Sequence, residues 1–96
     1  MVVPKGELDL ASVAAFQEEL EVVLEGTGRK LLLDLSSLTF IDSSGIAVIY
    51  HAGANLAHFA VVVPPASPVA PTLETCGFRQ VLQQFDSRAE ALRALA

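Results

Sequence analysis

The chain has 96 residues, of which 52% are hydrophobic, and its formal net charge at pH 7 is −5. This length suffices for one hydrophobic core, so we expect a single folded domain over residues 1–96. The acidic balance argues against direct binding to nucleic acid, and the short apolar runs without a secretory signal argue against membrane insertion, so we expect a cytoplasmic protein.

The first elements of the predicted fold are a helix and a buried strand. From residue 12 to 24, apolar residues recur three and four positions apart, which indicates one buried helix face. We expect Asp9 or Ser12 to cap this helix and Gly26-Thr27-Gly28 to end it. The continuous apolar run over residues 30–35 is typical of a strand with both faces covered. The residues of the helix face are Val13, Phe16, Leu20, Val23 and Leu24.

A turn of small polar residues, Asp42-Ser43-Ser44-Gly45, follows the stretch of residues 38–41. Such residues suit a tight turn and the N-terminus of a helix. The serines therefore mark the start of a second helix, at the point where a strand ends and at one rim of the predicted sheet. Behind them, apolar and small residues return at helical spacing, at Ile46, Ile49, Gly53, Leu56 and Ala57.

The second half of the chain predicts two more strands and two more helices. Residues 59–63 resemble a strand that stops at Pro64-Pro65, and residues 72–76 a short helix that ends at Gly77. Residues 81–85 fit an edge strand. Asp86 or Ser87 is expected to cap a last helix that turns Ala89, Leu92 and Leu95 inward. The alternation of strands and helices predicts an α/β fold with parallel pairs joined by helical crossovers.

The turn Asp42-Ser43-Ser44-Gly45 is the segment most suited to function, because the first backbone N–H groups of a helix have no partner within it. Its serines allow two interpretations. Either serine can be a simple helix cap. Alternatively, one serine accepts a phosphate, which adds a charge of about −1.5 to −2 that a helix N-terminus tolerates but a docked partner would have to desolvate.

An enzyme is the weaker interpretation of the same residues. Ser44, His51 and Asp34 could form a triad, but the Gly-x-Ser-x-Gly motif that exposes a nucleophilic serine is absent. His51 and His58 lie seven residues apart on the predicted helix, about 10 Å along its axis, too far to share a metal. The single cysteine, Cys76, is expected to be a small core residue. We therefore expect no enzymatic activity, no metal and no cofactor.

Several stretches together carry a resemblance to a known family: Gly6-Glu7-Leu8-Asp9, residues 31–36, residues 38–48 with the paired serines, and residues 73–78 with their closing glycine. With these residues the chain resembles the STAS domain family, and within it the bacterial anti-sigma factor antagonists. The resemblance implies a single STAS-like α/β domain. It also implies a mixed sheet of four to five strands with about four helices.

The resemblance further implies a protein-binding switch. In such antagonists the unphosphorylated form binds an anti-sigma factor that is a serine kinase, and a sigma factor is thereby released. The kinase ends this binding by phosphorylating the serine before the glycine, which is Ser44 here, and a metal-dependent serine phosphatase restores it. The resemblance carries over four neighbours as partner-binding residues, namely Asp42, Ser43, Gly45 and Ile46.

A second function stays open beside the switch. A non-switching STAS protein could serve as a scaffold in a stress-sensing assembly or as an accessory subunit of a lipid-transport complex, with Ser44 as a cap only. Two adjacent serines that directly follow an aspartate favour the switch. The acidic residues Glu18, Glu19 and Glu21 are explained as a solvated helix face, or as a contact for a basic patch of the kinase.

The start of the chain departs from the family pattern. Family members usually open with a strand before the one that ends in Gly-Glu-Leu-Asp, whereas only residues 1–5 precede Gly6 here. We therefore expect that this strand is truncated or missing. The sheet edge left free would allow two copies to pair as a homodimer.

Overall fold

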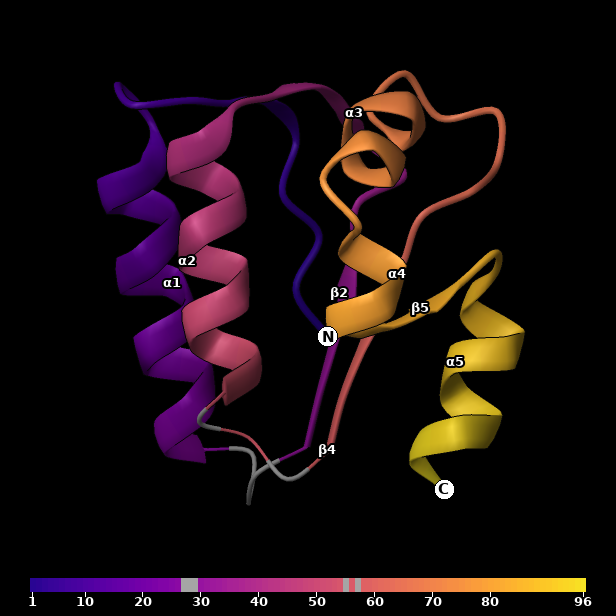
Figure 1. Ribbon diagram of the computed structural model, residues 1–96. Coiled ribbons are helices and arrows are strands. Elements are labelled where there is room, and N and C mark those ends of the chain that lie inside the picture. The colour runs from indigo at the N-terminus through magenta and orange to yellow at the C-terminus, as the bar shows by residue number, and fades with distance from the viewer. Residues whose placement is uncertain (27–29, 55, 57) are drawn as a thin grey trace.

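The computed structural model describes residues 1–26, 30–54, 56 and 58–96, and it confirms the predicted α/β class (Figure 1). Five strands and five helices follow one another along these residues. In chain order they are β1 (Gly6–Leu8), α1 (Val13–Gly26), β2 (Lys30–Asp34), β3 (Leu38–Ile41), α2 (Ser43–Ala54), β4 (His58–Val62), α3 (Ala70–Thr75), α4 (Phe78–Val81), β5 (Gln83–Phe85) and α5 (Arg88–Leu95).

The strands form two groups, β1-β3 and β2-β4-β5, and each described strand pairing is parallel. Where one mixed sheet was expected, the described residues thus form two sheets in which the strands are parallel. Parallel pairing places the ends of β1 and β3 at the same edge, where the Asp42 N–H donates to the Leu8 carbonyl at 3.1 Å. In Figure 1 this edge is at the top, and α1 and α2 both begin there.

The N-terminal residues occupy the edge of β2 that the sequence left unassigned. Val2 forms a parallel bridge with Leu33. The Val2 N–H donates to the Leu32 carbonyl at 3.0 Å, and the Asp34 N–H donates to the Val2 carbonyl at 2.9 Å. No strand precedes β1 in the described residues, and a single bridging residue lies at this edge of β2, which agrees with the expectation that the strand is truncated or missing.

The larger hydrophobic core lies on the sheet face that α1, α2, α3 and α4 cover, and the smaller one lies under α5. Leu31 and Leu33 of β2 point into the first core, whereas Leu32 between them points into the second. Both faces of β2 are thus covered, as its continuous apolar run predicts. The helix residues at the centre of the larger core are Phe16, Leu20, Ile46, Ile49, Leu73 and Phe78.

The structure confirms α1 and the start of α2. Phe16 and Leu20 are buried on α1. Asp9 and Ser12 both take part in the cap, because the Asp9 Oδ1 accepts from the Ser12 N–H at 3.1 Å and the Ser12 Oγ accepts from the Asp9 N–H at 3.0 Å. The helix α2 ends at Ala54, so it stops before Leu56, which the sequence placed on the same helix. Predictions for the Leu24 side chain and for Thr27, Gly28 and Ala57 lie outside the described residues.

Two elements depart from the predicted alternation of strands and helices. β3 follows β2 after the two-residue turn 36–37 and pairs with β1, so no crossover helix separates β2 from β3. The four-residue helix α4 lies between α3 and β5 and buries Phe78, whose ring stacks on Tyr50 with 5.6 Å between centroids. Cys76, at the C-cap of α3, is exposed, so the expectation that it is a core residue is wrong. The buried residue in this part of the chain is Phe78.

The inward face of α5 differs in part from the prediction, since Leu95 packs against the smaller core as expected but the other two residues do not. Ala91 is fully buried, whereas Ala89 is exposed and Leu92 is 58% exposed. The cause is the first residue of the helix, because Arg88 forms an ion pair with the buried Asp34 and this contact fixes the rotation of α5. Ser87 caps the helix as predicted, with its Oγ accepting from the Glu90 N–H at 3.3 Å. None of the helices within the described ranges is long and apolar enough to cross a membrane.

Candidate functional site

The predicted phosphorylation site lies in the first turn of α2. Asp42 follows the last residue of β3, and its carbonyl accepts from the Ile46 N–H at 3.1 Å, which is the first hydrogen bond of the helix. Asp42 is therefore the N-cap residue, and the serines come after it. The interpretation of Ser43 or Ser44 as the cap is corrected, because a carboxylate at the preceding position already fills that role.

The Asp42 carboxylate holds the whole turn together. Its Oδ1 accepts from the Ser44 N–H at 3.0 Å, from the Gly45 N–H at 3.2 Å and from the Ser44 Oγ at 2.5 Å. The Ser44 hydroxyl is thus a hydrogen-bond donor, and its direction is fixed by Asp42. We name these three hydrogen bonds the Asp42 clamp.

The clamp also sets the charge of Asp42. The Ser44 hydroxyl lowers the pKa of Asp42 most, and the N–H groups of Gly45, Ser44 and Leu10 lower it further, against an opposing effect of burial. Asp42 is therefore ionised at neutral pH. A negative charge already stands at this helix N-terminus, where the unpaired N–H groups and the helix dipole favour it.

The five predicted site residues differ in accessibility. Ser43 is exposed, and Asp42 and Ser44 are half-buried, so an approaching protein can reach them. Gly45 and Ile46 are buried. For these two residues the structure shows a packing role, and contact with a partner stays a prediction.

Gly45 is needed for the packing of α2 on β1. A Cβ atom at this position would stand 2.8 Å from the Leu8 Cγ and 3.0 Å from the Leu8 carbonyl oxygen. Real Cβ contacts are essentially never shorter than 3.0 Å, and the carbonyl oxygen belongs to the backbone, so it has little freedom to move. The glycine of the motif thus keeps the first turn of α2 close against the end of β1.

Two exposed apolar residues next to the clamp were missed by the sequence reasoning. Leu10, in the turn after β1, is 78% exposed, and Phe40, in β3, is 49% exposed. Phe40 is two residues before Asp42 and pairs with Glu7 of β1. The sequence carries no clear signal for these two residues, because singly exposed apolar side chains are common on protein surfaces.

The residues of the imagined catalytic triad do not come together. Asp34 is buried and forms its ion pair with Arg88, while its Oδ1 accepts from the Ser36 N–H at 2.9 Å. Burial alone would raise the pKa of Asp34, but the hydrogen bonds from Ser36 and Arg88 outweigh it and hold this pKa below its usual value. This carboxylate anchors α5 to β2.

The histidines also differ from the prediction that placed both on one helix. His51 lies on α2, whereas His58 is the first residue of β4. In the part of the chain that the structure describes, no three His, Cys, Asp or Glu side chains come close enough to hold a metal ion.

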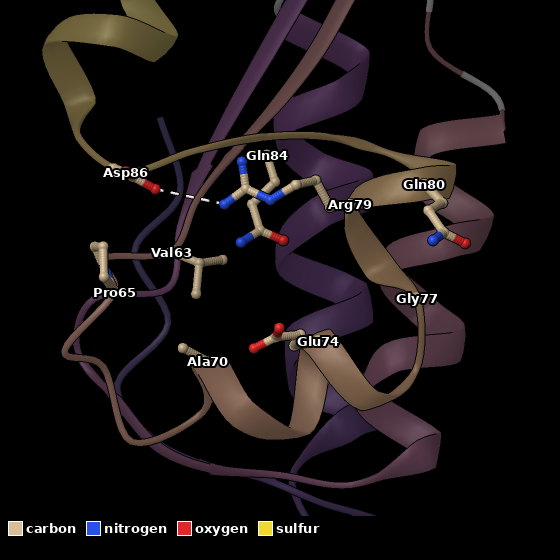
Figure 2. A pocket seen from close by; sticks show the side chains of 9 residues that line it. All are labelled: Val63, Pro65, Ala70, Glu74, Gly77, Arg79, Gln80, Gln84 and Asp86. Atoms are coloured by element: carbon tan, nitrogen blue, oxygen red, sulfur yellow. Dashed lines mark hydrogen bonds and ion pairs between the residues drawn. The ribbon is translucent and has the colours of Figure 1, made fainter.

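A cavity of about 430 Å³ lies near the carboxyl ends of β4 and β5. Figure 2 shows Arg79 of α4 reaching toward Asp86, which forms an ion pair with it at 3.5 Å, while Glu74 comes from α3 on the other side. The lining residues come from β5, α3, α4 and the adjoining loops, including the one after β4, and neither β3 nor α2 contributes one. The cavity and the Asp42 clamp are therefore separate features.

Comparison with known proteins assigns the fold to a family. The STAS domain model matches residues 1–91, and the chain belongs to the STAS domain family. A solved structure with the same fold is the crystal structure of an anti-sigma factor antagonist from Mycobacterium paratuberculosis, with a TM-score of 0.86 and 22% sequence identity. The alignment covers 97% of this chain and 81% of that chain. The comparison with curated proteins found no match.

Proposed function

We propose that this protein is an anti-sigma factor antagonist controlled at Ser44. In its unphosphorylated form it binds an anti-sigma factor that is a serine kinase, and this binding releases a sigma factor. Phosphorylation of Ser44 ends the binding. The observation that carries the proposal is the Ser44 hydroxyl itself, which is half-buried, held by the Asp42 clamp and located at the carboxyl edge of the strands.

Phosphorylation would turn the attraction between the Ser44 and Asp42 side chains into repulsion. In the unmodified protein the Ser44 hydroxyl donates a hydrogen bond to the Asp42 Oδ1, with 2.5 Å between the two oxygens. A phosphoserine has no proton on Oγ and adds a charge of about −1.5 to −2, so attraction to the carboxylate becomes repulsion. Because Asp42 already occupies the N–H groups of the turn, the phosphate has to displace the carboxylate or point outward. In either case a second anion stands where the partner docks.

The surface around Ser44 suits a protein partner better than a small molecule. Leu10 and Phe40 expose apolar area beside the clamp, and Ser43 is exposed at the first position of α2. Apolar and aromatic side chains of this kind anchor protein interfaces, and a new charge at their margin is costly because docking removes its water. The switch therefore follows from ordinary desolvation, without a change of fold.

The proposal includes a metal-dependent serine phosphatase that removes the phosphate and restores binding. It assigns the protein to the cytoplasm as one regulatory domain over residues 1–96, without enzymatic activity, cofactor or direct contact with nucleic acid. A homodimer through the sheet edge stays a prediction. The place of Val2 beside β2 argues against pairing at that edge.

A second candidate function is a non-switching STAS scaffold or accessory subunit. The observation that favours it is the same hydrogen bond, because a serine whose hydroxyl is satisfied by a carboxylate can be a structural part of the helix cap. The charge argument separates the two functions, since a scaffold has no need of a modifiable hydroxyl at this position.

The deciding experiment incubates the purified protein with its anti-sigma kinase and ATP and maps phosphate by mass spectrometry. We expect one phosphate, on Ser44, in the wild type and in Ser43→Ala, and none in Ser44→Ala. Ser43→Ala is the matched control, because it removes the neighbouring hydroxyl without touching the clamp. Phosphate on Ser36 or Ser87 would refute the assignment, and no phosphate on any residue would favour the scaffold.

A further inference from the structure

A groove between α1 and α2 lies outside the five site residues discussed above. Its volume is about 600 Å³, and Leu20 and Glu21 of α1 and Ala47 and Val48 of α2 are among its lining residues. Figure 1 shows that α1 and α2 run side by side in the same direction. Ala47, which has a small side chain, is exposed where it lines the groove.

The groove continues the face of α2 that carries Ser44. Ala47 and Val48 follow Ser44 by three and four residues, and such residues are neighbours on one face of a helix. The groove thus begins about one helical turn, roughly 5 Å, from the serine. A partner that reaches Ser44 from solvent is already at the entrance of the groove.

The charges around the groove are of one sign. The α1 segment carries four glutamates and no Lys or Arg, and α2 carries none of Asp, Glu, Lys or Arg. Of these glutamates, Glu21 lines the groove, and Glu18 and Glu25 lie three and four residues from it on the same helix face, whereas Glu19 lines a separate cavity. The groove therefore has an apolar base and, on the α1 side, an acidic wall of Glu18, Glu21 and Glu25. The glutamates of α1 are exposed and are Glu18, Glu19, Glu21 and Glu25.

We propose that this groove receives a basic, apolar segment of the same partner that engages Ser44. This inference rests on the proposed function and adds a second contact region to it. A second copy of this chain fits less well, because each copy has a net charge of −5 and would face the acidic wall with like charge. Contact at Ser44 makes recognition sensitive to phosphorylation, and contact in the groove provides affinity and selects the partner.

Two variants test the groove, and each has a matched control. Glu21→Lys reverses one charge of the acidic wall, and its control is Glu74→Lys on α3. Ala47→Arg fills the groove with a cation at an exposed position, and its control is Ala94→Arg on α5, which packs on the other face of the sheet. Thermal unfolding followed by circular dichroism verifies that all four variants are folded.

The readouts are the affinity for the anti-sigma kinase by calorimetry, at low and at moderate salt, and the KM and kcat for phosphorylation of Ser44. We expect both groove variants to weaken binding and raise KM at least about tenfold with little change in kcat, and Glu21→Lys to reduce the salt dependence. The two controls should bind within about twofold of the wild type.

Three outcomes would count against a part of the account. If the wild type is phosphorylated on Ser44 while both groove variants bind as it does, the groove inference is refuted and the proposed function stands. If the wild type is not phosphorylated, the proposed function itself fails. If the groove variants instead convert a dimer into monomers by size-exclusion chromatography with light scattering, the occupant is a second copy and the inference is wrong.

Discussion

The ion pair between Asp34 and Arg88 gives the sharpest prediction about stability. Asp34 has a 2% exposed side chain at the end of β2, and its partner Arg88 at the start of α5 is 49% exposed. Removing one partner of a buried pair costs about 3–5 kcal/mol. The half-exposed guanidinium and the remaining Ser36 hydrogen bond reduce this cost, so Arg88→Met should lower the free energy of unfolding by about 2 kcal/mol.

Replacing the arginine of a solvent-exposed ion pair by methionine provides the control. Arg79 and Asp86 are 63% and 52% exposed, and their closest atoms are 3.5 Å apart. Exposed pairs of this kind contribute about 0–1 kcal/mol, so Arg79→Met should leave stability nearly unchanged. Urea unfolding measures both free energies. In thermal unfolding Arg88→Met should shift the midpoint down by roughly 10 °C, since 1 kcal/mol corresponds to about 4–8 °C in a domain of this size.

The pH dependence of this stability loss tests whether the ionised Asp34 carboxylate is its cause. The pKa of Asp34 in the folded protein is lowered, so its contribution is present above the unfolded pKa of about 3.9 and is lost as the pH falls through the folded value. The stability difference between wild type and Arg88→Met should be greatest near neutral pH and should shrink in acid. Equal losses for Arg88→Met and Arg79→Met, or a difference that does not change with pH, would refute the reasoning.

Three further predictions concern the site. Gly45→Ala should lower the free energy of unfolding by about 1–2 kcal/mol in urea unfolding, because the clash with Leu8 exceeds the gain in helix propensity; a stabilised variant would contradict this packing role. Phe40→Ser should weaken kinase binding about tenfold by calorimetry, while Leu92→Ser, equally apolar and 58% exposed on α5, should not; equal effects would exclude Phe40 as an anchor. Ser44→Asp should bind the kinase more weakly, and unchanged affinity would count against the charge mechanism.

The start of α2 could be predicted from the sequence because its signals are local. Small polar residues follow an extended stretch, and apolar residues resume at helical spacing within one turn. The identity of the cap could not be predicted in the same way. Asp42, Ser43 and Ser44 are all good capping residues, and the end of β3 decides which one becomes the N-cap.

The missed features depend on contacts that are distant in sequence or on very short elements. β3 has four residues of which Thr39 and Phe40 are both exposed, so the alternation that indicates a strand is absent. The rotation of α5 depends on Arg88 meeting Asp34, which is 54 residues away along the chain. Local helical spacing cannot reveal such a pair, and it therefore selected Leu92 rather than Ala91 as the buried residue.

The most direct test of the central claim compares two forms of the same protein. The anti-sigma kinase is titrated by calorimetry with the unphosphorylated protein and with protein phosphorylated fully on Ser44. The account predicts firm binding of the first form and an affinity at least about a hundredfold weaker for the second, because docking would have to desolvate a second anion beside Asp42. Equal affinities of the two forms would contradict it.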